Sequence, residues 1–491
     1  MAENIRTTPL RIRPNEYRSL LVMGDLAMAV VSLLVALYTW GQYNLYVREI
    51  LIDQYIAGGI GPSRAGELAR GQTVFEIPFW FYILPVIWIL LLVELYEPHV
   101  ASSGRRTTRG ITIAAFIGLL AYSVVFIIQQ ESNLPRIGVG AFLLYAALLT
   151  LLWRMIFIRI YKSTGQRRRV LLIGAGKAGQ TLAELYNSAG TQSFNLIGYV
   201  DDDTAKVGKR ICGLRVLGSS LHLLSIIDVY HISDLVIAIN GEIQGATFQS
   251  ILDAQERGVE VTRMPILYEE MTGRVPVHHL ESDWIIRSFV DGLHVSGIYE
   301  LTKRLLDILG ASVGLLIFAF TSPFLSIAVW ADSGFPIFYS QPRLGKGGLI
   351  FKIYKYRSMR QDAEADGEAK TTLENDPRVT RVGGFLRKTR LDELPQFWNV
   401  LRGEMSLVGP RAERPELVAD YQRQVPFYRA RLLVKPGLTG WAQINYGYVA
   451  SVTETAVKIE YDLYYIKHRT FAMDFQIILR TIGTVLRRTG R

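Results

Sequence analysis

The sequence predicts a protein of three parts: a membrane α-helical bundle of four spans over residues 1–160, an α/β domain over residues 161–285, and a mainly α domain over residues 296–491. Four apolar segments predict the bundle, and an apolar strand that runs into a glycine-rich turn predicts the α/β domain. An uncharged apolar stretch at 308–331, broken in its middle by a serine-proline pair, predicts a re-entrant membrane helix in the third part. A chain of 491 residues is also too long for one hydrophobic core.

Hydropathy places the four spans at about 19–41, 76–96, 111–128 and 137–158. Basic residues precede the first span, lie between the second and the third, and follow the fourth, whereas the other two loops carry fewer positive charges. The positive-inside rule therefore places both ends of the bundle in the cytoplasm. We expect the bulk of the chain beyond residue 160 to be cytosolic.

Charge and cysteine content narrow the class of partner. The net charge is +10, but the basic residues cluster beside apolar spans and no Lys/Arg-aromatic nucleic-acid motif is present, so we expect anionic membrane lipids and no nucleic acid. Cys212 is the single cysteine, which excludes an internal disulfide. Asp25 and Glu94 lie near span ends, and we interpret them as packing or interface residues without a transport role.

A glycine-rich turn follows the first predicted strand of the α/β domain. Gly174, Gly176 and Gly179 suit a tight turn, a close approach of backbone amides to a pyrophosphate, and close packing of helix on strand. Asp201, at the end of the next strand, has the position of a ribose-binding acid. Later apolar runs alternate with helical stretches, so we predict a Rossmann-like domain with a parallel sheet of four or five strands. The turn predicts a nucleotide site, yet the same glycines suit an empty scaffold, and both remain open.

The apolar stretch at 308–331 contains the pair Ser322-Pro323. A straight helix of this length would cross a bilayer of roughly 30 Å, but proline removes a backbone donor and clashes with the preceding turn, so a bend is expected. The segment can dip into the membrane and turn back, which would place the later carboxylates Asp392 and Glu393 at the boundary between water and lipid. Lys303 and Arg304 precede the stretch, and we interpret them as headgroup anchors.

Nine ordered motifs in the last third of the chain carry a resemblance to a known family. They are Lys303–Asp307, Ser322–Pro323, Gln341–Gly345, Lys355–Met359, Leu391–Gln396, Asn399–Gly403, Met405–Arg411, Lys435–Gln443 and Tyr461–Leu463. This series resembles the bacterial sugar transferase family, the monotopic phosphoglycosyltransferases. The order of spans, Rossmann-like domain and this domain is similar to the large members that start exopolysaccharide, capsule or O-antigen synthesis at the bacterial inner membrane.

The resemblance implies transfer of a sugar-1-phosphate from a UDP-sugar to undecaprenyl phosphate, with release of UMP, Mg²⁺ as cofactor and a covalent phosphosugar-enzyme intermediate. Asp392 is implied as nucleophile and magnesium ligand, with Glu393 assisting. Displacement at phosphorus between two anionic substrates does need a cation and an ionised nucleophile. Pro395 predicts a helix that begins near Leu391, which would place both carboxylates at a helix N-terminus. Large relatives also suggest a homodimer.

Six further residues are candidates for substrate binding. They are Lys355, Arg357, Arg411, Thr439, Trp441 and Asp462. Arginine after a Gly-Pro turn suits a diphosphate, and Asp462 matches a family aspartate that is either structural or a second metal helper. The chain departs from the family pattern at Tyr356, Ala412 and Trp330–Asp332, positions that bear on sugar, nucleotide and membrane contacts.

Two other functions fit parts of the pattern. Tyr299 and Lys303 have the Tyr-x-x-x-Lys spacing of short-chain dehydrogenases, so the alternative enzyme is a membrane-anchored NAD-dependent nucleotide-sugar dehydratase. This alternative requires a second glycine-rich strand-turn-helix before Tyr299, and the sequence contains none. The other possibility is a non-catalytic scaffold of polysaccharide assembly that uses the Rossmann-like domain as a sensor.

Overall fold

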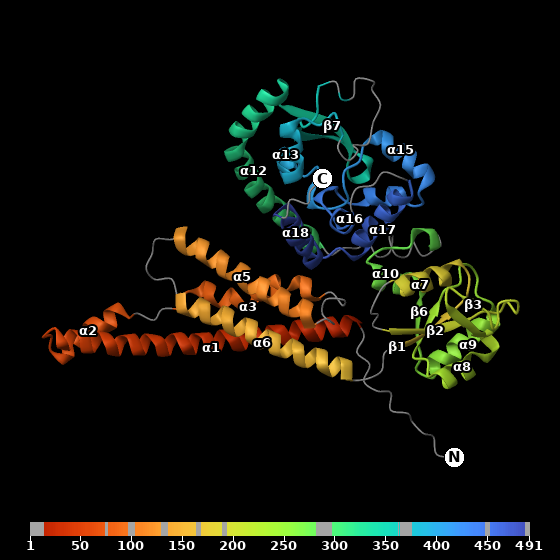
Figure 1. The fold of residues 1–491 in the computed structure, drawn as a ribbon, viewed down its shortest axis with the longest axis horizontal. Coiled ribbons are helices and arrows are strands. Elements are labelled where there is room, and N and C mark those ends of the chain that lie inside the picture. Colours follow the sequence, from red (N-terminus) through yellow and green to blue (C-terminus); the bar gives the residue numbers. More distant parts are fainter. Residues whose placement is uncertain are drawn as a thin grey trace, which may run out of the picture. The chain divides into compact units, whose positions relative to one another are not determined.

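The structure is a computed structural model that describes residues 14–486 except 74–76, 97–103, 129–135, 164–167, 189–193, 281–296, 362, 364–375 and 447–451. The chain forms two compact units, Met1–Gln166 and Arg167–Arg491 (Figure 1). The predicted boundary between the second and third parts, near residues 285–296, falls outside the described residues and stays a prediction.

The first unit is helical. Its elements are α1 (Pro14–Ala57), α2 (Pro62–Gln72), η1 (Phe79–Ile83), α3 (Leu84–Leu91), η2 (Val93–Tyr96), α5 (Gly104–Ile128) and α6 (Arg136–Ser163). α1 and α6 pack closely because Gly24 has no side chain, and a Cβ there would lie 2.1 Å from the ring of Trp153. Trp88, Phe81 and Phe142 are buried between the helices. The unit is therefore a bundle with an apolar core of its own.

Three helices in the described part of the chain are long and apolar enough to cross a membrane. They are Ser19–Ala57 in α1, Arg136–Ile160 in α6 and Gly297–Ser333 in the second unit. The first and fourth predicted spans are thus present as such helices. The second falls on the short apolar segment Phe79–Leu91, and the third lies within α5, so the prediction of four spans is only partly confirmed.

A buried ion pair joins α1 to α6. Arg154 Nη2 lies 2.6 Å from Asp25 Oδ2, and both side chains are almost wholly buried. The same guanidinium donates from Nη1 to the carbonyl of Leu95. Asp25 is therefore a paired packing residue, as the sequence indicated, while the side chain of Glu94 lies outside the described residues.

The second unit begins with a six-stranded mixed sheet. Its strands are β1 (Arg168–Ile173), β2 (Phe194–Val200), β3 (Arg210–Ile211), β4 (Leu214–Gly218), β5 (Asp234–Ile237) and β6 (Glu260–Arg263), in the order β3-β4-β2-β1-β5-β6. Five strands pair in parallel and β3 is an antiparallel edge. The predicted strands are all present, and β3 is the one that the sequence pattern did not indicate.

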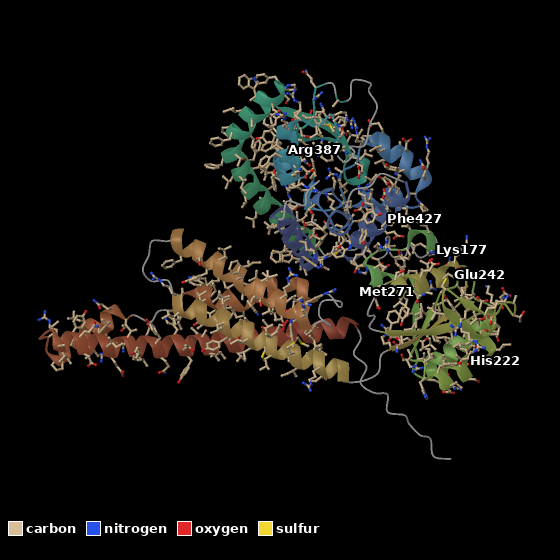
Figure 2. All side chains as sticks on the ribbon, viewed as in Figure 1. Lys177, His222, Glu242, Met271, Arg387 and Phe427 are labelled. Carbon is tan, nitrogen blue, oxygen red and sulfur yellow. The ribbon has the colours of Figure 1, made fainter. Side chains whose placement is uncertain are left out.

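Helices cover both faces of this sheet. α7 (Lys177–Ser188) and α10 (Met264–Thr272) bury apolar side chains with one face, and α8 (Leu223–Tyr230) and α9 (Gly245–Glu256) do so with the other. Lys177 and Met271 accordingly lie on the opposite side of the sheet from His222 (Figure 2). Buried strands of a parallel sheet have two apolar faces, which explains the nearly continuous apolar sequence of β1.

The remainder of the second unit is mainly helical, as predicted. Its elements are α12 (Gly297–Ser333), β7 (Phe338–Leu344), η6 (Lys346–Gly348), β8 (Ile350–Tyr356), α13 (Arg381–Thr389), η7 (Leu391–Gln396), α14 (Phe397–Arg402), β9 (Ser406–Val408), α15 (Pro415–Gln424), η8 (Tyr428–Leu433), β10 (Gly437–Thr439), α16 (Trp441–Asn445), α17 (Val452–His468) and α18 (Phe471–Leu486). The short helix η4 (Val277–His279) precedes it and packs with α17 in one apolar cluster.

α12 differs in form from the predicted interrupted segment. It is one continuous helix of 37 residues with Pro323 inside it, and its ribbon changes direction partway along (Figure 1). Pro323 cannot donate to the carbonyl of Ala319, so the helix lacks one backbone hydrogen bond there and can bend. The helix nevertheless continues beyond the proline. Ser322 and Pro323 therefore mark the expected bend but do not interrupt the helix, which extends beyond the predicted 308–331 at both ends.

Both ends of α12 are held by the same globular part of the unit. Near its start, Asp307 accepts from Ser406 Oγ at 2.9 Å and from the amide of Leu407 at 2.8 Å. Near its end, Asp332 accepts from the amide of Val382 at 2.9 Å. The apolar residues between these ends are largely exposed, namely Leu316, Phe320, Phe324 and Ile327. A helix fixed at both ends with an exposed apolar middle has the form that a re-entrant membrane segment requires.

Candidate active site

The acidic pair lies in a tight turn between two helices. α13 ends at Thr389, Arg390 adopts a left-handed conformation with φ of +58°, and η7 then carries Asp392 and Glu393 in its first turn. The predicted α-helical start near Leu391 is a 3₁₀ helix because Pro395 has no amide to donate to the carbonyl of Leu391. α14 has only six residues, so its dipole adds little here, and the surrounding side chains dominate the electrostatics.

Glu393 faces three cations. Its Oε1 lies 3.4 Å from Lys355 Nζ and 3.4 Å from Arg411 Nη2, and its Oε2 lies 3.5 Å from Arg390 Nη1. Burial acts to raise the pKa of Glu393, but Lys355, Arg411 and Arg390 together lower it to about 2. Glu393 is therefore an ionised carboxylate at neutral pH that holds the cations in place.

Asp392 has a different environment although it is the adjacent residue. It is 7% exposed, and its Oδ1 is buried with no hydrogen-bond partner among the described residues. Burial and the charge of Glu393 raise the pKa of Asp392 to about 6, against the opposing charges of Lys355, Arg387 and Arg390. An ionised oxygen that is buried without a donor is poorly stabilised, and such an oxygen is suited to bond to an electrophile or a metal ion.

A small pocket beside the pair collects further donors. Its lining includes Arg343, Lys355, Gln396 and Arg411, together with Ile353, Met405, Ala412, Gly437 and Leu438. Sequence reasoning gave Arg343 and Gln396 no role, although both lie within recognised motifs. The two-residue alternation of a strand could have shown that Gln341 and Arg343 share one face, and the helical spacing after Asp392 could have indicated Gln396.

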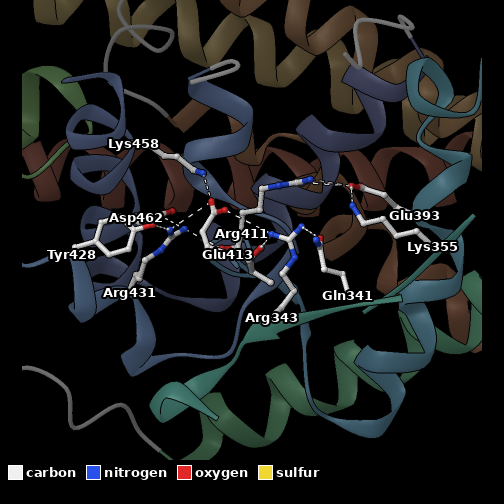
Figure 3. Close-up of polar contacts among 11 residues, drawn as sticks. Gln341, Arg343, Lys355, Glu393, Arg411, Glu413, Tyr428, Arg431, Lys458 and Asp462 are labelled. Atoms are coloured by element: carbon white, nitrogen blue, oxygen red, sulfur yellow. Dashed lines mark hydrogen bonds and ion pairs between the residues drawn. The ribbon is translucent and has the colours of Figure 1, made fainter. Parts of the chain in front are cut away.

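A second cluster of charges contacts the backbone of Arg411 on the side away from Glu393 (Figure 3). Arg431 Nη2 donates to the backbone carbonyl of Arg411 at 3.0 Å and lies 2.9 Å from Asp462 Oδ2. Glu413 Oε1 accepts a hydrogen bond from Lys458 Nζ at 2.5 Å and lies 3.6 Å from Arg431 Nη1. Asp462 is almost fully buried in this ion pair. A structural role, one of the two roles expected for this residue, therefore fits its position. Its role as a metal helper stays a prediction.

Arg357 lies at the end of α12. Its Nη2 donates to Ser333 Oγ at 3.0 Å and to the carbonyls of Ser333 and Gly334, so it caps the C-terminus of α12. Its Nε and Nη1 are buried without partners among the described residues. The structure thus groups Lys355 and Arg411 with the acidic pair and gives Arg357 a separate contact.

Thr439 and Trp441 have partners within the fold. Thr439 Oγ1 lies 2.7 Å from Thr481 Oγ1. The indole of Trp441 is buried, donates to the carbonyl of Gly273 at 2.9 Å and stacks on Tyr464 with 5.9 Å between ring centroids. Both residues can be explained by packing, so their predicted contact with the nucleotide stays a prediction.

The segment that includes α10 binds α17 through buried polar groups. Glu460 accepts from Tyr268 Oη at 3.0 Å and lies 3.5 Å from Arg274 Nη1. Burial raises the pKa of Glu460 to about 7 because Arg274, Tyr268 and a backbone hydrogen bond from Val277 do not fully replace its lost hydration.

Lys303 and Arg304 are not headgroup anchors. Lys303 Nζ lies 2.9 Å from Asp474 Oδ2, and Tyr299 Oη donates to the same carboxylate at 2.8 Å. Arg304 donates to the carbonyls of Val400 and Leu401, at the end of α14. The Tyr299–Lys303 pair, on which the dehydratase alternative depended, is therefore used to hold α12 to α18 through Asp474.

The glycine-rich turn is partly explained by the fold itself. Gly174 has a φ of +104°, and a Cβ on Gly179 would lie 2.2 Å from the carbonyl oxygen of Gly174. A Cβ on Gly176 would meet nothing within 4 Å, so packing does not require this glycine. Asp201 accepts from the amide of Ala175 at 2.7 Å and lies 3.2 Å from Lys206 Nζ. The carboxylate expected to bind a ribose is thus already occupied.

No group of three or more His, Cys, Asp or Glu side chains within the described ranges could hold a metal ion by itself. Magnesium does not need such a group, because it is often held by one or two carboxylates together with substrate phosphates. The buried, unpaired Oδ1 of Asp392 fits a ligand of that kind.

Comparison with known proteins identifies the family. A family model described as "Bacterial sugar transferase" matches residues 298–488, and a model described as "CoA-binding domain" matches residues 92–260. The UDP-galactose-lipid carrier transferase of Erwinia amylovora is 32% identical over 66% of this chain and 69% of its own length. The UDP-glucose:undecaprenyl-phosphate glucose-1-phosphate transferase of Xanthomonas campestris pv. campestris is 28% identical over 90% of this chain and 93% of its own length.

The chain belongs to the bacterial sugar transferase family. The UDP-N-acetylgalactosamine-undecaprenyl-phosphate N-acetylgalactosaminephosphotransferase of Aeromonas hydrophila is 42% identical over 46% of this chain, and the match spans about half, 52%, of that relative. A solved UDP-D-quinovosamine 4-dehydrogenase from Vibrio fischeri aligns with 24% of this chain at 22% identity and a TM-score of 0.19, a likeness too weak for any argument.

Proposed function

We propose that this protein transfers a sugar-1-phosphate from a UDP-sugar to undecaprenyl phosphate at the cytoplasmic face of the bacterial inner membrane, releases UMP, and thereby initiates synthesis of an exopolysaccharide, capsule or O-antigen. The observation that carries the proposal is the buried, unpaired oxygen of Asp392 beside a carboxylate that three cations surround. Such a site suits a nucleophile that must attack an anionic substrate.

The position of the pair next to α12 supports a lipid acceptor. Leu391 belongs to the apolar cluster around Val329 of α12, and Phe397 contacts α12 at Gly314, where a Cβ would lie 2.4 Å from its ring. The apolar middle of α12 is exposed and has no charged residue. A carrier with a long apolar chain and one phosphate could thus be received beside Asp392 at the depth of the lipid headgroups.

The reaction proceeds in two displacements under this proposal. A carboxylate oxygen of Asp392 bonds to the phosphorus that carries the sugar, and the bond from that phosphorus to the bridging oxygen breaks, so that the electron pair leaves with UMP. A phosphate oxygen of the lipid then attacks the same phosphorus, which breaks the aspartyl bond and restores the carboxylate. Lys355 and Arg411 orient the diphosphate, and Glu393 keeps both cations in position.

Mg²⁺ is the proposed cofactor. Asp392 would hold it together with the substrate phosphates, and the bound ion would screen the negative charge that repels the attacking carboxylate.

The N-terminal bundle is proposed to have four spans and both ends in the cytoplasm, and the following domain to be Rossmann-like. The protein is proposed to act as a homodimer, which crosslinking in native membranes tests. A nucleotide at Gly174, Gly176 and Gly179 would have to share Asp201 with the amide of Ala175. Calorimetric titration of the purified protein with NAD, coenzyme A and UDP-sugars tests that site.

The decisive experiment is an assay of UMP release from a panel of UDP-sugars, with and without undecaprenyl phosphate and Mg²⁺, in membranes that contain the protein. Release that depends on one donor, the acceptor and the metal is the expected result. Absence of UMP release from every donor rejects the proposed function. Accessibility labelling that finds residues 335–491 outside the cell rejects the proposed topology.

A further inference from the structure

Arg343 presents a guanidinium that the fold satisfies only in part. It lies on β7 opposite Phe351 of β8, on the same face as Gln341 and Lys355. Its Nη2 donates to Gln341 Oε1 at 2.7 Å and its Nη1 to the carbonyl of Ala412 at 3.2 Å. Its Nε is buried and has no acceptor among the described residues. Arginine has five donor hydrogens, so a buried guanidinium with an empty Nε has capacity for a further acceptor.

Gln396 adds a second unused donor to the same pocket. Its side chain is 5% exposed, and its Nε2 is buried with no acceptor within the described part of the chain. Gln396 and Arg343 both line the pocket that Lys355 and Arg411 also line. A buried amide donor without a partner destabilises the fold, which makes such a donor informative about what the pocket binds.

The charges around the pocket also favour binding of an anion. Arg343, Lys355 and Arg411 lie together, and Glu393 is the carboxylate within 3.5 Å of the latter two. Arg343 has its nearest carboxylate, Glu413, at 3.9 Å, and Glu413 is bound more closely by Lys458 and Arg431. Burial and the charge of Arg411 lower the pKa of Arg343 to about 10, so it remains charged at neutral pH. Figure 3 shows Arg343 next to Arg411, with Glu413 and Gln341 on either side of Arg343.

We propose that Arg343 and Gln396 bind the phosphate of the nucleotide leaving group, UMP, and so form a leaving-group subsite distinct from the contacts of Glu393. The inference rests on the proposed function. When an oxygen of Asp392 bonds to the sugar-bearing phosphorus, the bridging P–O bond breaks and its electrons remain on the UMP oxygen. Arg343 Nε and Gln396 Nε2 donate to the phosphate on which this charge develops. The second displacement, from Asp392 to the lipid phosphate, needs neither residue.

The test compares UMP binding with the two half-reactions, using the full-length protein in nanodiscs. The variants are R343Q, R343K and Q396A, and the matched controls are R423Q and Q422A on the exposed face of α15. We expect R343Q to raise the inhibition constant of UMP roughly 10- to 150-fold, the range for a hydrogen bond to a charged group. R343K should keep part of the affinity, and Q396A should weaken UMP several-fold. Transfer from preloaded enzyme to undecaprenyl phosphate should stay within about twofold of wild type.

The possible outcomes distinguish failure of the leaving-group subsite from failure of the proposed function. Unchanged UMP affinity in R343Q and Q396A, with melting temperatures like the wild type, overturns the subsite. Equal loss in both half-reactions also overturns it, because a structural defect would slow both. If wild-type protein neither binds UMP nor releases it from any UDP-sugar, the proposed function itself fails. Should R343Q not fold, R343K and Q396A decide, and an unaltered UMP inhibition constant in both rejects the subsite.

Discussion

Two carboxylates at turns of the second unit differ in the hydrogen-bond partners that the fold provides for them. Asp201 follows the glycine-rich strand-turn region, and its oxygens are bonded by the amides of Ala175 and Asp203 and by Lys206. Asp392 lies in the turn before α14, and its Oδ1 is buried with no partner among the described residues. Sequence motifs marked both as site residues. The first is occupied by its own chain, whereas one oxygen of the second has no hydrogen-bond partner in the described part of the chain.

Two further carboxylates fall between these extremes. Asp462 is buried but paired with Arg431, and Glu460 is buried with a hydroxyl, a more distant guanidinium and a backbone hydrogen bond from Val277. The four together form a series from the most to the least compensated carboxylate, because Asp392 is opposed only by the charges of Lys355, Arg387 and Arg390 while its Oδ1 has no hydrogen-bond partner among the described residues. Because an uncompensated buried charge destabilises the fold, the residue at the end of the series is the one whose presence function must explain.

The largest effect is expected for Asp392→Asn. The change keeps the shape but removes the attacking oxygen's charge, so UMP release should fall by at least about 10³-fold. Removing a buried charge should leave the melting temperature equal or higher, which separates lost chemistry from lost folding. A D420N variant on the surface of α15 serves as the control. Retention of UMP release by D392N would contradict the nucleophile assignment.

Asp462→Asn should act on stability instead. It leaves the buried Arg431 with Glu413, at 3.6 Å, as its one ion-pair partner among the described residues, and breaking a buried pair typically costs about 3–5 kcal/mol. We expect a clear drop in melting temperature, measured by intrinsic fluorescence, with UMP release at low temperature reduced far less than in D392N. Activity loss as deep as that of D392N, in protein with an unchanged melting temperature, would move Asp462 into the catalytic group.

Glu460 predicts a dependence of stability on pH. Its pKa is raised by burial to about 7, so the folded state binds a proton that the unfolded state releases near pH 4.5. The ionised form therefore destabilises the fold, and stability should fall as pH rises from about 4.5 to 7. The difference between wild type and Glu460→Gln should grow over that window by roughly 1–3 kcal/mol. A constant difference in melting temperature from pH 5 to pH 8 would show that Glu460 is fully compensated.

The smallest effect is expected for Asp201→Asn. An amide oxygen can still accept from Ala175, and the partly exposed contact with Lys206 contributes about 1 kcal/mol or less. UMP release should stay within about twofold of wild type. A loss of tenfold or more without unfolding would make the glycine-rich turn part of the reaction and would remove the contrast with Asp392.

The sequence was sufficient for features that repeat or that depend on neighbours in the chain. Apolar runs predicted the strands of the sheet, because buried parallel strands have a distinctive composition. The Ser322-Pro323 pair predicted a bend, since proline acts on the adjacent turn of its own helix. Motif order predicted the family, which the comparisons confirm.

Contacts between distant residues were beyond the sequence. Lys303 meets Asp474, 171 residues later, and no local pattern distinguishes that ion pair from a headgroup anchor. Arg343 and Gln396 belong to recognised motifs, but their unused donors became visible only when both lined one pocket. Burial of Trp441 against Gly273 is a third case, because an indole can serve a core or a ligand equally well.

The ion pair between Asp25 and Arg154 has a consequence for how the bundle reaches the membrane. Its members lie 129 residues apart, so the first long helix is synthesised well before the arginine that neutralises it. An unpaired aspartate or arginine is costly in lipid, so we expect the first long helix to be stable in the membrane only once the later helix is present. We therefore expect stable insertion of α1 and α6 to depend on both members of the ion pair.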